Sequence, residues 1–245
     1  MSQPAANIHL SQLKQTAQSG GYWLISAVLN DPIEKVCAYY AVNDCKHPVQ
    51  NEQACSNIQH RFKLSLFDYQ FPKLQLLSKQ PLRQTFLDLD ALTLTQIEHT
   101  LINFEANQTT LLLGHDLGIG PLFYTAKQIK NNGYKHLALL EASSGFPFAV
   151  KPAQFMLQDF PFEAIGGCSL LEDWKIANRL ASDLGLPGCF EGSITTLIKP
   201  WLVAENQRQA IEPIHWQILS FLPEEKQQIL TEITRPYTWL SLKTI

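Results

Sequence analysis

The sequence predicts an α/β protein in which a β-rich, barrel-like region precedes a doubly wound parallel sheet of five strands. Short segments rich in β-branched and aromatic residues fill the first hundred positions. From residue 109 onward, apolar strands alternate with helical patterns, which is typical of a parallel sheet. A chain of 245 residues is long enough for two small domains, which we expect over 1–100 and 101–245.

The strands expected in the first region are short and closely spaced, and they cover residues 21–29, 35–42, 60–69 and 73–78. Prolines at 32, 48 and 72 separate them. Residues 43–59 are polar and are expected to form a loop. Strands this close together favour an antiparallel sheet or a small barrel.

A connecting helix is expected over residues 93–106. Apolar residues recur there at helical spacing, at Leu94, Ile97, Leu101 and Phe104. Thr93 precedes them as a candidate N-cap. The boundary between the two regions is expected near this helix.

The second region is expected to contain five strands, at 109–114, 135–142, 162–167, 215–221 and 238–242. The helices between them are expected at 121–133, 193–202 and 223–233. Two of these begin with proline, which suits the first turn of a helix. A further helix against the sheet is suggested by the spacing of Leu170, Trp174, Ala177 and Leu180.

Composition narrows the classes of function. The net charge is −3 and no Lys/Arg-rich block occurs, which argues against nucleic-acid binding. No apolar run reaches the roughly 18 residues of a membrane span, and the N-terminus lacks a signal-peptide pattern, so a cytoplasmic location is expected. The five cysteines contain no CxxC pair, so neither a metal site nor an iron–sulfur cluster is expected.

The segment TTLLLGHDLGIGPLF, residues 109–123, carries the strongest local signal. An apolar strand runs into a turn with Gly114, Gly118 and Gly120, and a helix follows. The N–H groups at such a helix start suit a pyrophosphate, although the glycines would equally serve close packing of strand and helix. Glu141, at the end of the next strand, is placed to accept hydrogen bonds from a ribose, which favours NAD over NADP.

The wider pattern resembles the nucleotide-binding module of the ferredoxin reductase superfamily, where a strand leads into G-G-G-x-G-I-x-P-L. The positions that match are Gly114, Gly118, Ile119, Pro121 and Leu122. Segment 188–198 resembles a G-x-x-G-x-V-T-x-L motif of dihydroorotate dehydrogenase electron-transfer subunits, and Pro223 falls at the family's Cys-Gly-Pro turn. The resemblance implies an oxidoreductase or electron-transfer protein with NAD and FAD as cofactors. It also implies a redox partner protein or catalytic subunit.

The departures from that pattern leave a second reading open. His115 and Asp116 stand where the family has glycines, and a carboxylate repels a pyrophosphate. Phe221 and Leu222 replace the family's Cys-Gly. The barrel's Arg-x-Tyr-Ser/Thr strand is not found, Arg61 being the nearest arginine in a strand, and the four cluster cysteines are missing. The alternative is a non-catalytic, partner-binding protein that keeps the fold without a cofactor.

A third reading comes from the same turn. GHDLG resembles the nucleophile elbow of epoxide hydrolases and haloalkane dehalogenases, which are α/β-hydrolases. In that reading Asp116 is the nucleophile, His115 is its neighbour and His215 is the candidate water-activating base. The family's His-Gly oxyanion segment is absent from the sequence.

Overall fold

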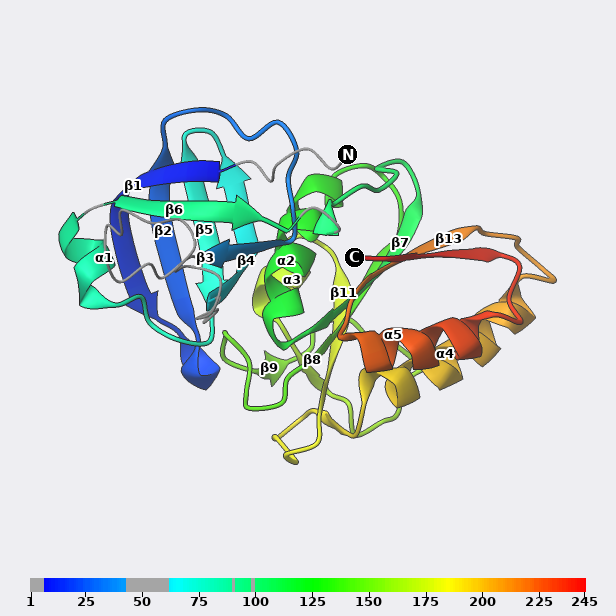
Figure 1. Cartoon of the computed structure of the whole chain (residues 1–245). Coiled ribbons are helices and arrows are strands. Elements are labelled where there is room, and N and C mark those ends of the chain that lie inside the picture. Colours follow the sequence, from blue (N-terminus) through cyan, green and yellow to red (C-terminus); the bar gives the residue numbers. More distant parts are fainter. Residues whose placement is uncertain (1–6, 43–61, 90, 98–99) are drawn as a thin grey trace.

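The chain forms an antiparallel barrel followed by a parallel sheet with helices on both faces (Figure 1). A computed structural model describes residues 7–42, 62–89, 91–97 and 100–245. Helix α2 (Ile119–Ile129) packs against both barrel strand β4 (Phe62–Gln70) and sheet strand β7 (Thr109–His115), so it joins the two parts. The predicted fold class is confirmed.

The barrel is closed by six strands in the order β1-β2-β5-β4-β3-β6. Its remaining strands are β1 (Asn7–Ala17), β2 (Trp23–Leu29), β3 (Tyr39–Val42), β5 (Lys73–Ser78) and β6 (Ala91–Gln96). A 3₁₀ turn, η1 (Ser19–Gly21), joins β1 to β2, and a short helix, α1 (Gln84–Leu89), precedes β6. Alternate strand residues fill the barrel interior, as in any small closed barrel. They include Leu10, Ile25, Leu64, Leu76 and Leu94.

Strand β1 was not predicted, and a β-bulge explains why. Ile8 and Leu10 point into the barrel, but the register with β2 shifts between Ser11 and Lys14. Gln12 takes a left-handed conformation (φ 52°) at this point, and the next inward residue is Leu13. The bulge inserts one residue into the alternation, so the period-2 pattern breaks in the sequence.

The helix expected over 93–106 is wrong. Residues up to Gln96 belong to β6, which pairs with β1 on one side and β3 on the other and so closes the barrel. Leu92 and Leu94 are buried and alternate with threonines, which is a strand pattern. The backbone hydrogen bonds that close the barrel outweighed the helical preference suggested by the spacing that begins at Leu94.

The parallel sheet has six strands in the order β12-β11-β8-β7-β13-β14. Five are long, four of them predicted, and β12 (Phe190–Glu191) adds two residues at one edge. Besides β7, the long strands are β8 (His136–Glu141), β11 (Ala177–Ser182), β13 (Trp216–Phe221) and β14 (Leu240–Thr244). Every residue of β8 and β13 is buried, as expected of strands covered on both faces.

Two expectations inside this sheet are wrong. Of the strand expected over 162–167, only β10 (Gly166–Gly167) forms, and it pairs with β9 (Lys151–Pro152) in a separate ribbon. Helix α3 (Ser169–Asp173) stops after five residues, and the chain then enters β11. Strand β11 was not predicted because Arg179 interrupts its apolar run. In the structure Arg179 is nevertheless only 6% exposed.

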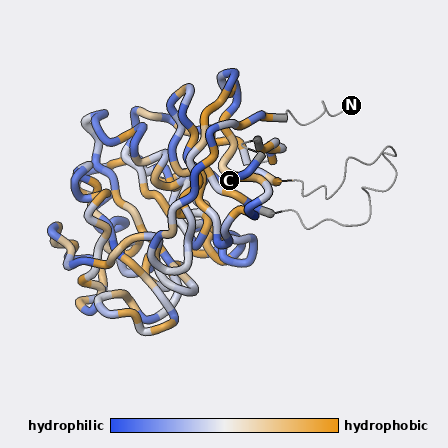
Figure 2. Tube along the Cα trace, turned by 90° about the vertical axis from the view of Figure 1, so that its left-hand side faces the viewer, coloured by the Kyte–Doolittle hydropathy of each residue, from blue (hydrophilic) through white to orange (hydrophobic). Residues whose placement is uncertain are grey.

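The sheet is covered by α2 and α3 on one face and by α4 (Ile194–Arg208) and α5 (Glu224–Thr234) on the other. Helices α4 and α5 lie side by side in Figure 1. In Figure 2, hydrophobic residues lie mostly in the interior of the trace, and many hydrophilic ones lie in its outer turns. Burial on both faces therefore supplies the core of this part.

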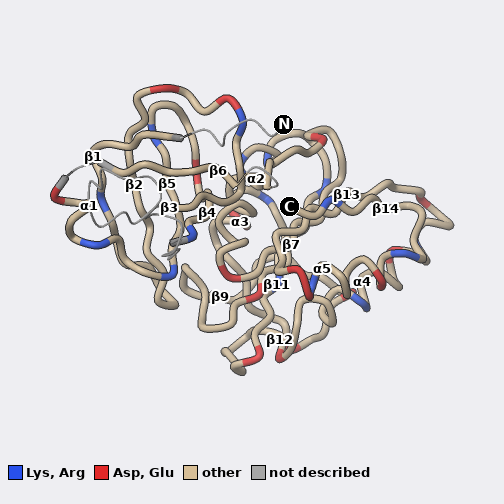
Figure 3. The backbone as a smooth tube through the Cα atoms, viewed as in Figure 1, with Lys and Arg blue, Asp and Glu red and all other residues tan. Residues whose placement is uncertain are grey.

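Charged residues of both signs are interspersed along the described chain (Figure 3). Among the described helices, none is long and apolar enough to cross a membrane. Within the same residues, no group of three or more His, Cys, Asp and Glu side chains is arranged to hold a metal ion. The expected loop at 43–59 and the candidate Arg61 lie outside the described residues.

Candidate functional site

The glycines of the turn at 114–120 make close backbone packing possible. A Cβ at Gly118 would lie 1.9 Å from the carbonyl oxygen of Phe221 in β13. A Cβ at Gly120 would lie 2.6 Å from the carbonyl oxygen of Leu66 in β4, and one at Gly114 would lie 3.0 Å from that of Gly118. Glycine at these positions lets α2 approach both β13 and the barrel.

The helix start that follows the turn is buried as well, whereas His115, Asp116 and Leu117 are half-buried. Strand β7 ends at His115, a 3₁₀ turn η4 (Asp116–Gly118) follows, and α2 begins at Ile119. Ile119 and Pro121 face the core. The predicted strand–turn–helix is therefore present, with its apolar residues in packing positions.

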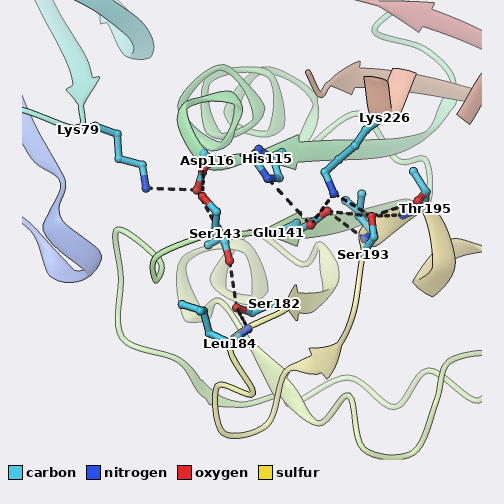
Figure 4. Close-up of polar contacts among 12 residues, drawn as sticks. Lys79, His115, Asp116, Glu141, Ser143, Ser182, Leu184, Ser193, Thr195 and Lys226 are labelled. Carbon is cyan, nitrogen blue, oxygen red and sulfur yellow. Dashed lines mark hydrogen bonds and ion pairs between the residues drawn. The ribbon is translucent and has the colours of Figure 1, made fainter. Parts of the chain in front are cut away.

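Asp116 is the hub of a hydrogen-bonded cluster at this turn (Figure 4). Its Oδ1 accepts hydrogen bonds from the Tyr22 hydroxyl at 3.0 Å, Lys79 Nζ at 3.2 Å and Ser143 N–H at 3.0 Å. Its Oδ2 accepts from the Ser143 hydroxyl. Tyr22 and Lys79 belong to the barrel side of the molecule and Ser143 to the loop after β8, so this one carboxylate ties the two parts together.

The electrostatics keep this carboxylate ionised. Burial by itself would raise the pKa of Asp116, but the hydrogen bonds from Ser143 and the charges of His115 and Lys79 outweigh it, so the pKa lies below its usual value. Burial and the nearby Asp116 charge raise the pKa of Tyr22, so its hydroxyl remains a donor. The Lys79 ammonium also lies 3.9 Å from the centre of the Tyr22 ring.

The backbone at Asp116 is held in a left-handed conformation, with φ at 50°. Aspartate tolerates this region better than most residues, but it still costs free energy. The surrounding contacts therefore hold the residue in place. The fold therefore holds both the backbone and the side chain of Asp116 in one conformation.

Glu141 is the second carboxylate of the site, at the end of β8, and it is 2% exposed. Lys226 Nζ donates to its Oε1 at 2.8 Å, and the Ile194 N–H at the start of α4 donates to its Oε2 at 3.0 Å. The Ser193 hydroxyl caps α4 and lies 3.4 Å from the same Oε2. Both oxygens of Glu141 thus have donors from within the chain.

His115 stands between the two carboxylates. Its Nδ1 lies 3.8 Å from Asp116 Oδ2, and its Nε2 lies 4.0 Å from Glu141 Oε1. The carboxyl ends of β7 and β8 therefore carry one continuous set of polar and charged side chains, with Lys79 on one side and Lys226 on the other.

The remaining candidates lie apart from this cluster. Pro223 caps α5 just beyond the carboxyl end of β13. His215 precedes the first residue of β13, and β13 runs parallel to β7 in register, with Phe221 opposite Gly114. His215 and Asp116 are therefore at opposite ends of the strands, roughly 25 Å apart at the rise of a strand.

Four partners in the cluster carried no sequence signal for this site: Tyr22, Lys79, Ser143 and Lys226. Tyr22 and Lys79 are 94 and 37 residues from Asp116 along the chain. Such pairs become visible only after folding. Ser193 caps α4, since its side chain accepts a hydrogen bond from Thr195 N–H.

Comparisons with known proteins agree on the fold. No family model matches the chain, and no curated protein matches it. Among solved structures, the cytochrome P450 reductase GcoB of Amycolatopsis matches with a TM-score of 0.60 at 10% identity, over 100% of this chain and 72% of that one. The ferredoxin reductase in carbazole 1,9a-dioxygenase matches at 0.57 and 11% identity, over 100% and 70% of the two chains.

A third match covers both chains almost fully. The flavohem-like FAD/NAD-binding domain of nitric oxide dioxygenase from Vibrio cholerae matches with a TM-score of 0.52 at 12% identity, over 99% of each chain. The resemblance to the ferredoxin reductase superfamily is thus confirmed at the level of fold. The chain shares the fold of these three proteins, of which the Vibrio cholerae domain is named as one that binds FAD and NAD.

Proposed function

We propose that this chain keeps a reductase fold for a non-catalytic, partner-binding role, without a dinucleotide at its glycine turn. The observation that carries the proposal is the set of donors around Asp116. Four donor groups from three side chains and one backbone N–H already serve this carboxylate. These donors come from both the barrel and the parallel-sheet part. The turn therefore already forms a contact between the two parts of the chain.

A pyrophosphate at this turn would face that carboxylate. Two like charges 4 Å apart repel by about 4 kcal/mol at the effective dielectric of a protein surface. Moving Asp116 aside would leave the Tyr22 hydroxyl, Lys79 and the Ser143 N–H without their acceptor, and each lost charged hydrogen bond costs about 1.5–3 kcal/mol. The residues present therefore do not fit a pyrophosphate.

Glu141, the predicted acceptor for a ribose hydroxyl, also binds groups of the chain itself. Glu141 already accepts hydrogen bonds from Lys226 and from the start of α4 and is 2% exposed, so a ribose hydroxyl would have to compete with these donors for a buried carboxylate. On the flavin side, the resemblance calls for an arginine on the barrel strand, and β4 offers Lys63 among its described side chains. Lys63 lies over the Tyr39 ring, 3.7 Å from its centre. These contacts favour structural roles for Asp116, Glu141 and Lys63.

The hydrolase reading receives less support from the geometry. A nucleophilic carboxylate needs a free oxygen directed at substrate and a base within hydrogen-bond reach of the attacking water. Both oxygens of Asp116 accept hydrogen bonds, and His215 lies at the other end of the strands. We therefore assign Asp116 a structural role.

Partner binding is supported by two observations. Two structural neighbours are named as a cytochrome P450 reductase and as the ferredoxin reductase in a dioxygenase, that is, as proteins that act with another protein. The described surface also carries large apolar side chains with high exposure, among them Met156 and Phe162. A partner protein is the kind of ligand that covers such side chains.

The test is a ligand panel on the purified full chain. NADH, NADPH, FAD and FMN are each added at about 1 mM, the upper end of usual KM values, and the melting temperature and visible absorbance are recorded. A ligand at 100 times its Kd would raise the melting temperature by about 5 °C or more. We expect no shift and no flavin absorbance.

Asp116→Gly is the matched variant, because it restores the family's residue and removes the carboxylate. A shift with wild type that persists or grows in this variant would overturn the proposal and support a flavin or nicotinamide reductase. Turnover of an ester or epoxide by wild type that Asp116→Asn abolishes would instead support the hydrolase.

A further inference from the structure

A pocket opens at the amino ends of the parallel strands, at the opposite end of the sheet from Asp116. Its lining includes the first residues of β8, β11 and β13, which are His136, Ala177 and Trp216. The pocket has a volume of about 600 Å³. Small-molecule sites have volumes of about 300–1,000 Å³, so this pocket is large enough to hold one.

Aromatic and apolar side chains form much of the wall. Trp201 and Trp216 pack edge to face with their ring centres 4.9 Å apart, and both belong to the core cluster that contains Leu137. Tyr134 and Ile211 also line the pocket, and they are 48% and 88% exposed. Aromatic side chains pack well against flat rings, stacked or edge to face. The wall therefore suits a planar ligand.

An ion-pair network supplies polar groups in the same pocket. Arg208 Nη2 lies 2.8 Å from Asp159 Oδ2 and 2.8 Å from Glu205 Oε2, and Arg208 Nε donates to the same Oε2 at 2.9 Å. Glu205 is 4% exposed, and its Oε1 accepts hydrogen bonds from Trp216 Nε1 at 3.0 Å and Gln209 Nε2 at 3.2 Å. These contacts hold Arg208 in one orientation, and a group held in advance loses less freedom when a ligand binds.

Two atoms of this network keep hydrogen-bonding capacity for a ligand. Within the part of the chain that the structure describes, Arg208 Nη1 and Asp159 Oδ1 have no hydrogen-bond partner. Both side chains reach solvent, since Arg208 is 45% exposed and Asp159 28%. A guanidinium nitrogen only donates and a carboxylate oxygen only accepts. The pocket therefore offers one donor and one acceptor that belong to the same ion pair.

The charges of the lining balance, which favours a neutral ligand. Three cations and three carboxylates line the pocket: Lys135, Lys175, Arg208, Asp159, Glu205 and Glu212. An ion would lose hydration without a net attraction to repay it. A neutral molecule that carries an acceptor next to a donor would satisfy both Arg208 and Asp159. A cyclic amide has this arrangement, because its C=O and N–H groups are adjacent in the ring.

We propose that this pocket binds a planar, neutral cyclic amide, the chemical class to which the nucleobase uracil belongs. The carbonyl oxygen of the ligand accepts a hydrogen bond from Arg208 Nη1, and its N–H donates to Asp159 Oδ1. The ring contacts the aromatic wall, and the volume of the pocket leaves room for a substituent on the ring. The site is independent of the glycine turn, which lies at the other end of β7.

Saturation-transfer NMR of the purified full chain with uracil, from about 0.1 to about 10 mM, tests the proposal. We expect saturable binding with a Kd of about 1 mM, because so small a ligand can make few contacts. Uracil methylated at both ring nitrogens is the matched ligand control, since it keeps the ring and lacks the N–H groups. It is expected to bind roughly fivefold more weakly or less. Benzoate, which is planar but anionic, is also expected to bind more weakly than uracil.

Two variants locate the site. Asp159→Ala removes the acceptor and Tyr134→Ala removes an exposed aromatic wall, and each is expected to weaken uracil binding roughly fivefold or more. Val203→Ala is the control, because Val203 is 53% exposed on α4 but does not line the pocket, and it is expected to bind like wild type. The melting temperature shows whether each variant is folded. If a variant does not fold, the comparison of ligands on wild type still decides.

Three results would each overturn the proposal. They are no saturable binding of uracil by wild type, binding of the methylated uracil or benzoate as tight as that of uracil, and an unchanged Kd for uracil in folded Asp159→Ala or Tyr134→Ala. The proposed function is tested separately, because its variant Asp116→Gly changes the glycine turn and leaves this pocket intact.

Discussion

The Tyr22 hydroxyl of the barrel lies 3.0 Å from Oδ1 of Asp116 at the end of β7. This single hydrogen bond joins the first turn of the barrel to the turn where the family places glycines. Close packing reinforces it, because a Cβ on Gly20 would lie 2.6 Å from the carbonyl carbon of Gly145. The junction between barrel and sheet is thus built from the chain's own groups.

Removal of the Asp116 carboxylate is expected to destabilise the whole molecule. Asp116→Ala leaves a tyrosine hydroxyl, a lysine and a serine N–H without their acceptor, so the free energy of unfolding should fall by about 2–4 kcal/mol. Urea unfolding measures it. Asp88→Ala is the control, since Asp88 bonds only an exposed glutamine side chain among the described residues and should change stability by less than about 0.5 kcal/mol. Equal effects of the two would show that the cluster carries no stability.

Low pH is expected to reduce the free energy of unfolding, partly through protonation of Asp116. Its folded-state pKa lies below the usual value of 3.8, so the ionised form stabilises the fold. That contribution is fully present above the unfolded-state pKa and is lost as the pH falls through the lower folded-state pKa. We expect the unfolding free energy of wild type to drop more steeply below about pH 4 than that of Asp116→Asn. Urea titrations at several pH values give both slopes, and parallel slopes would contradict this account.

The Glu141–Lys226 pair should show strong coupling. Lys226→Met leaves a nearly buried carboxylate without its cation, which costs about 3–5 kcal/mol. Glu141→Gln in the same chain removes the stranded charge and should recover most of that loss. A double-mutant cycle in urea measures the coupling free energy. Additive effects of the two substitutions would mean that the pair is not coupled.

A methyl group at Gly118 should force the turn apart. Gly118→Ala would place its Cβ 1.9 Å from the Phe221 carbonyl oxygen, so α2 or β13 must shift. Overpacking of this kind costs about 1–3 kcal/mol or more. Gly185→Ala is the comparison, because Gly185 has a positive φ of 62° but open space around its Cβ position and should cost only about 1 kcal/mol. Thermal unfolding compares the loss of stability in the two variants. A smaller loss for Gly118→Ala than for Gly185→Ala would refute the packing role of Gly118.

The sequence could predict elements whose signal is local. The buried apolar runs of β8 and β13, and the prolines at the starts of α2 and α5, stand in the printed chain and gave correct elements. The order of those elements was enough for the α/β class and for the resemblance to ferredoxin reductases. Locality also explains the errors, because the bulge in β1 and the buried Arg179 in β11 break the periods that identify strands.

The site divides in the same way. The sequence by itself placed Asp116 in a glycine turn after a strand and Glu141 at the end of the next one. Only the tertiary structure decided what those carboxylates bind, because Tyr22, Lys79 and Lys226 reach them from distant parts of the chain. A hydrogen bond depends on separation in space, and the spacing of residues along a chain does not contain that separation until the barrel and the sheet have packed together.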